Sequence, residues 1–120
     1  MSFTRLVPYL AGHRFLYVGQ TPDLPGVLRD AGSGCAYATT LQDLDPDVIL
    51  RACPDVVLSP LLCESHDILD VARALNTLGY SGELIAIARS LPHYAMVQDE
   101  VREIWSAGNF TIIETDRLLH

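Results

Sequence analysis

The stretch Asp55-Val56-Val57-Leu58-Ser59-Pro60 decides the fold of this chain. Val56-Val57-Leu58 is a continuous β-branched and aliphatic run, and Ser59-Pro60 closes it with residues that favour turns. A strand without polar alternation is typical of the centre of a parallel sheet, because both of its faces are covered. The sequence therefore predicts an α/β protein built around residues 55–58.

On either side of this stretch, short apolar runs alternate with amphipathic ones. Asp45-Pro46 is a helix cap followed by a first-turn proline, and Gly79 follows the last apolar residue of a long helical pattern. The expected strands are residues 15–18, 35–39, 55–58, 83–88 and 110–113, and the expected helices are residues 24–31, 46–52, 65–78 and 94–107.

Alternating strands and helices connect by right-handed crossovers and cover both faces of one parallel sheet. We therefore expect a three-layer, doubly wound flavodoxin-like fold with five strands in the order 2-1-3-4-5. The whole chain, residues 1–120, is expected to be one domain with residues 1–12 as an N-terminal extension. Ligands of such folds bind beyond the carboxyl ends of strands one and three, where the strand order reverses.

Composition narrows the class of protein. Hydrophobic residues make up 49% of the chain and charged residues 19%, which predicts a compact fold rather than disorder. The net charge is −7, every basic residue is a scattered arginine, and there is no lysine, so we expect no direct nucleic-acid partner. Three cysteines without C-x-x-C spacing, no signal-peptide pattern and no membrane-spanning run predict a reduced, cytoplasmic protein without membrane contact.

Three segments carry a resemblance to a known family: Pro54 to Leu62, the helical pattern of residues 68–75, and Ile85-Ala86-Ile87-Ala88. Together they resemble the middle of a response-regulator receiver domain (CheY-like). The segment Ala107-Gly108-Asn109-Phe110 is similar to the glycine turn that leads a receiver into its fifth strand. The resemblance extends from Phe15 to about Glu114 and implies the receiver's doubly wound fold.

The same resemblance implies where an acidic pocket would lie, since receivers hold Mg²⁺ and a phosphorylated aspartate there. A hard cation needs carboxylate oxygens, and this chain does not supply them at the matching positions. The chain is thus similar to degenerate pseudo-receivers, which are not phosphorylated on aspartate. The acidic pair falls on Gly19 and Gln20, the phosphoacceptor on Ser59, the hydroxyl residue on Ala88, and the lysine on Glu114 or Thr115.

Receivers end with a helix after the fifth strand, and residues 116–120 are too few to form it. An uncovered sheet face of a few hundred Å² implies a cover. We expect the N-terminal segment, with Phe3, Leu6, Val7 and Leu10 at helical spacing, to provide most of it; a second copy or a partner protein are the alternatives.

The favoured function is a phosphorylation-independent regulatory module that contacts a signalling kinase, a transcription regulator or a second copy as a homodimer. The expected contact residues are Tyr94, Gln98, Arg102, Trp105 and Glu114, although the apolar members of this helix are most simply interpreted as core. The alternative is a small-ligand sensor whose cleft would be formed by Gln20, Thr21, Ser59, Pro60 and Arg89. A weaker alternative is an enzyme of unrecognised type.

Other chemistry finds little support. Cys63, His66, Asp67 and His93 are possible metal ligands, but their spacing matches no zinc pattern. Cys63 is expected to be an inert thiol, because the neighbouring carboxylates oppose a thiolate. Ser59 has a simpler interpretation as a residue of a strand-to-loop turn. No enzymatic activity, cofactor or metal is therefore expected.

Overall fold

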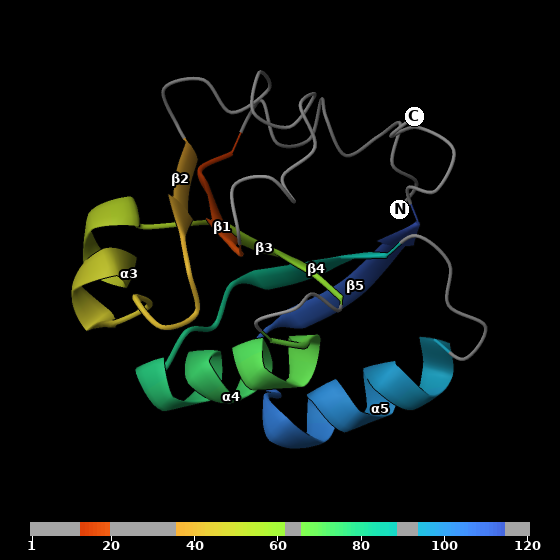
Figure 1. The fold of residues 1–120 in the computed structure, drawn as a ribbon. Coiled ribbons are helices and arrows are strands. Elements are labelled where there is room, and N and C mark those ends of the chain that lie inside the picture. The colour runs from red at the N-terminus through yellow and green to blue at the C-terminus, as the bar shows by residue number, and fades with distance from the viewer. Residues whose placement is uncertain (1–12, 20–35, 62–65, 89–93, 115–120) are drawn as a thin grey trace.

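A parallel five-stranded sheet forms the centre of the protein (Figure 1). The structure is a computed structural model that describes residues 13–19, 36–61, 66–88 and 94–114. The strands lie in the order β2-β1-β3-β4-β5, and every neighbouring pair is parallel. Their bounds are Phe15–Val18 (β1), Ala36–Thr39 (β2), Val56–Pro60 (β3), Glu83–Ala88 (β4) and Asn109–Glu114 (β5).

The predicted central strand has its expected character. Val56, Val57 and Leu58 are fully buried, and β3 pairs with β1 on one side and β4 on the other. The strand continues through Ser59 and Pro60, two residues further than predicted. Proline is tolerated there because it is the last residue of the strand, where the loss of one donor costs little.

Three helices connect the described strands: α3 (Pro46–Ala52), α4 (Ile68–Leu78) and α5 (Tyr94–Ile104). All three pack against the same sheet face, in one buried cluster with Leu16, Val57 and Leu84. The opposite face carries a second buried cluster. This second cluster contains Phe15, Tyr17, Val56, Leu58, Ile85 and Ile113.

The helix predicted at residues 24–31 and the predicted N-terminal cover lie outside the described residues.

Local capping chemistry sets the bounds of α3. The Asp45 carboxylate accepts a hydrogen bond of 2.9 Å from the Val48 backbone N–H, and Pro46 occupies the first turn, as predicted. The helix ends at Cys53, which adopts a left-handed conformation with φ of 46°. The helix thus has the predicted bounds, although glycine usually occupies the left-handed position that follows a helix.

The helix α4 begins later than the predicted Ser65. Asp67 is its N-cap, and the helix ends at Gly79, whose φ of 74° matches the predicted glycine cap. The apolar stripe of this helix is buried as expected. Its buried members are Ile68, Val71, Ala72 and Leu75.

The connection between α5 and β5 corrects one predicted contact residue. Trp105 is 1% exposed, its indole N–H donates a 2.7 Å hydrogen bond to the Tyr80 carbonyl, and its ring stacks on that of Tyr80 at 6.1 Å. It therefore belongs to the core and does not lie on an interaction face. The helix ends at Ile104 rather than at Ala107, because Trp105 turns inward to reach this partner.

Candidate functional site

The strand order reverses between β1 and β3, so their carboxyl ends define the edge where a doubly wound fold binds ligands. Gly19 follows β1, and its backbone N–H donates a 2.8 Å hydrogen bond to the Thr39 carbonyl at the end of β2. A Cβ atom at Gly19 would lie 3.1 Å from the Tyr17 side chain and 3.2 Å from Pro60 Cδ. This edge is closely packed, and a side chain at position 19 would require Tyr17 and Pro60 to shift by a few tenths of an ångström.

Ser59, which the receiver resemblance would match to the phosphoacceptor, is completely buried. Its Oγ lies 3.0 Å from the Pro60 carbonyl oxygen, to which it donates, and 3.1 Å from Nε2 of His66. A hydroxyl group can both donate and accept, so the Oγ atom can hold both contacts at once. The Ser59 hydroxyl is thus satisfied within the protein and does not face solvent.

His66 is 5% exposed and lies immediately before the N-cap of α4. The next residues return toward the sheet, where the Ile68 N–H donates a 2.9 Å hydrogen bond to the Leu61 carbonyl. The end of β3 and the start of α4 are therefore joined by a side-chain contact and by a backbone contact. The sequence pattern did not predict this buried pair of His66 and Ser59.

The predicted ligand-cleft residues are only partly described. Gln20, Thr21 and Arg89 lie outside the described residues, as do Cys63 and His93. Pro60 is half-buried and pairs in register with Ile87 of β4. The burial of Ser59 differs from the expectation that it faces a ligand, and its side chain contacts His66 instead.

The predicted contact residues lie on α5, just after α5 and at the end of β5. Gln98 is half-buried and Arg102 is exposed, and these two residues lie one turn apart on the helix. Tyr94 begins α5 and Glu114 ends β5. With Trp105 in the core, Gln98 and Arg102 are the described side chains that remain available for contact.

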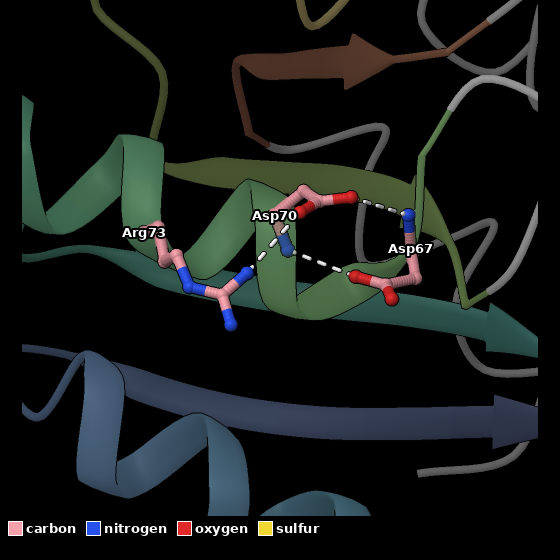
Figure 2. Close-up of polar contacts among 3 residues, drawn as sticks. All are labelled: Asp67, Asp70 and Arg73. Atoms are coloured by element: carbon pink, nitrogen blue, oxygen red, sulfur yellow. Dashed lines mark hydrogen bonds and ion pairs between the residues drawn. The ribbon is translucent and has the colours of Figure 1, made fainter.

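The start of α4 carries a reciprocal cap that is drawn in Figure 2. The Asp67 carboxylate accepts a 3.0 Å hydrogen bond from the Asp70 N–H, and the Asp70 carboxylate accepts one of 3.1 Å from the Asp67 N–H. Arg73 lies 3.2 Å from the other oxygen of Asp70. Asp67 and Asp70 thus serve the helix, and within the described ranges no cluster of metal-ligating side chains occurs.

A cavity of about 180 Å³ lies beside this cap, between α4 and α5. Its walls are mostly aliphatic, with two carboxylate residues among them. Glu100 is exposed, so the cavity reaches the surface. Sequence patterns did not indicate this cavity, because its walls come from three separated segments. The lining residues are Leu61, Asp67, Ile68, Leu69, Val97 and Glu100.

The parallel sheet with helices between its strands defines an α/β protein with a flavodoxin-like fold. The chain is similar to the solution structure of two-electron reduced flavodoxin from Megasphaera elsdenii, with a TM-score of 0.50 and 12% identity over 82% of this chain and 85% of that chain. At this identity the similarity shows the fold alone. The receiver domain shares this fold, but no protein-family model and no curated protein matches the chain.

None of the described helices is long and apolar enough to cross a membrane.

Proposed function

We propose that this protein is a phosphorylation-independent regulatory module that acts by contact with another protein. The observation that supports this most directly is the Ser59–His66 pair. Where a receiver presents an aspartate to its phosphodonor, this chain has a fully buried hydroxyl that is bonded to its own His66 and Pro60. A phosphoryl donor cannot reach a group with no exposed surface.

Position 19, at the end of the neighbouring strand β1, also lacks the carboxylate that a Mg²⁺ site would need. Gly19 stands where a receiver has a carboxylate, and Tyr17 and Pro60 would crowd any side chain at this position. Mg²⁺ binding by protein needs oxygen ligands, of which carboxylates are the strongest. The absence of a carboxylate at position 19 and the burial of Ser59 favour a function through a protein contact surface.

The contact surface that we propose includes Gln98 and Arg102 on α5. Arg102 is an exposed cation on a chain with a net charge of −7, so it offers an attractive site for an acidic surface, including that of a second copy. A signalling kinase or a transcription regulator is the alternative partner. The net charge of −7 does not favour direct binding to nucleic acid.

Incubation with acetyl phosphate and Mg²⁺ tests the phosphorylation-independent part of the proposal. Intact-mass spectrometry is expected to show no added phosphoryl group, while a genuine response-regulator receiver treated in parallel gains one. A stable phosphoryl group on any aspartate of this chain would contradict the proposal.

Sedimentation velocity over a wide range of protein concentration tests the contact function. We expect a concentration-dependent dimer that Arg102→Glu weakens. Arg51→Glu is the matched control, since Arg51 is an exposed arginine of α3 whose ion pair with Asp47, at 3.6 Å, contributes little to stability. Equal effects of the two variants would remove α5 from the contact surface.

The small-ligand sensor remains the second candidate, although the burial of Ser59 does not favour it. Thermal-shift screening with nucleotides and metabolites distinguishes the two functions. A ligand at a hundred times its dissociation constant stabilises the folded state by about 2.7 kcal/mol. Such a shift would favour the sensor.

A further inference from the structure

The cavity between α4 and α5 has the size of one side chain. A cavity of about 150 Å³ with aliphatic walls is large enough to bind benzene. The cavity here has a volume of about 180 Å³, and Leu61, Ile68, Leu69 and Val97 form its apolar walls. It therefore has room for one leucine or phenylalanine side chain.

An exposed apolar side chain lies on α5, next in sequence to the cavity residue Val97. Met96 is 63% exposed and lies next to Val97, one turn before Glu100. An exposed methionine beside an apolar cavity is typical of a surface that adapts to a partner. We call the cavity and its lining residues the groove, and Met96 lies beside Val97 in the sequence of α5.

The charge at the mouth of the groove is negative. Glu100 is exposed, and within the described part of the chain no arginine forms an ion pair with it. Asp67 adds a second carboxylate to the cavity wall. The nearest described arginine ion pair, Arg73 with Asp70, lies one turn further along α4.

Glu100 and Arg102 lie on opposite flanks of α5. Successive residues of a helix are about 100° apart, so Glu100 is about 160° from Arg102 around the axis. Val97 and Val101 lie between these flanks and point toward the core. The groove is thus a different surface from the Gln98–Arg102 face.

We infer that this groove binds a basic amphipathic segment of a partner protein, which places one aliphatic or aromatic side chain in the cavity and an arginine or lysine beside Glu100. The inference rests on the proposed contact function and specifies the chemistry of a partner. A second copy is disfavoured as the occupant by its own net charge of −7.

The test is a titration of the methyl-labelled full chain followed by NMR. The probe is N-acetyl-leucyl-arginine amide, and its matched probes are N-acetyl-leucyl-glutamate amide, which reverses the charge, and N-acetyl-glycyl-arginine amide, which removes the apolar side chain. The leucyl-arginine probe is expected to shift the methyl resonances of Ile68, Leu69 and Val97 saturably. Both matched probes are expected to bind roughly threefold to tenfold more weakly.

Two charge-reversing variants separate a specific pairing from general electrostatic attraction. Glu100→Arg is expected to reverse the preference, so that the glutamyl probe binds more tightly than the arginyl probe. Asp99→Arg makes the same charge change on an exposed residue that does not line the cavity, and it is expected to retain the original preference. Both positions are exposed on α5, so the spectra of both variants should show the native fold.

Several outcomes would overturn this inference. One is equal affinity for the arginyl and glutamyl probes, and another is the absence of saturable shifts in the groove up to the solubility limit of the probe. Loss of preference in Asp99→Arg as well as in Glu100→Arg would show a nonspecific charge effect. Groove resonances that move with protein concentration alone would assign the groove to a second copy. The mass and sedimentation experiments are independent of these readouts, so the two proposals fail separately.

Discussion

The Oγ atom of Ser59 lies 3.1 Å from Nε2 of His66, and both side chains are buried. This contact joins the end of the central strand β3 to the residue before the N-cap of α4.

Replacement of Ser59 by alanine is expected to lower the free energy of unfolding by about 1–3 kcal/mol, because it removes one partner of a buried hydrogen bond. Urea denaturation measures this change as a lower midpoint at an unchanged m-value. Ser106→Ala is the control, since Ser106 is exposed and the substitution should stay within about 0.5 kcal/mol. Equal stability of the two variants would show that the Ser59–His66 contact contributes nothing.

Replacement of Asp67 by alanine removes the acceptor for the Asp70 N–H at the start of α4. We expect a loss of about 1 kcal/mol in the free energy of unfolding, the usual effect of losing an N-cap. Asp67→Asn keeps a side-chain oxygen at this position and should retain most of the stability. If asparagine is as destabilising as alanine, capping is not the role of this side chain.

Replacement of Cys53 by glycine is expected to stabilise the protein by about 1 kcal/mol. Cys53 holds a left-handed conformation with φ of 46°, which costs a residue with a Cβ atom roughly this amount. Cys53→Ala keeps the Cβ atom and is expected to leave the thermal midpoint nearly unchanged. A stabilisation by alanine as large as that by glycine would trace the effect to the thiol instead.

Substitutions at Gly108 and Gly79 distinguish the cost of steric crowding from the cost of backbone strain. A Cβ atom at Gly108 would collide with the Gly82 carbonyl oxygen and lie 2.7 Å from the Trp105 ring, so Gly108→Ala should cost about 1–3 kcal/mol or more. Gly79 has a φ of 74° but open space around it, so Gly79→Ala should cost only about 1 kcal/mol. Chemical denaturation of both variants measures the order, and a larger loss at Gly79 would contradict the close packing at Gly108.

Some features of this protein were predictable because they depend on neighbours in the chain. The strands Phe15–Val18 and Glu83–Ala88 have the predicted bounds, since a run of apolar residues between turn residues marks a buried strand. Asp45 caps the start of α3 and Gly79 caps the end of α4, as expected, because a cap acts within three or four residues of itself. The α/β class follows from this alternation.

The features that bear on function were decided by tertiary structure. Ser59 and His66 are seven residues apart and meet only because the chain turns back from β3 into α4. The helical spacing of Trp105 was most simply that of a core residue but also allowed a contact surface, and the fold decides for the core by placing the Tyr80 carbonyl 2.7 Å from its indole nitrogen. The groove between α4 and α5 needs Leu61 and Val97 side by side. Periodicity reports which face of an element is apolar, whereas the partner that this face meets depends on contacts between segments distant in the sequence.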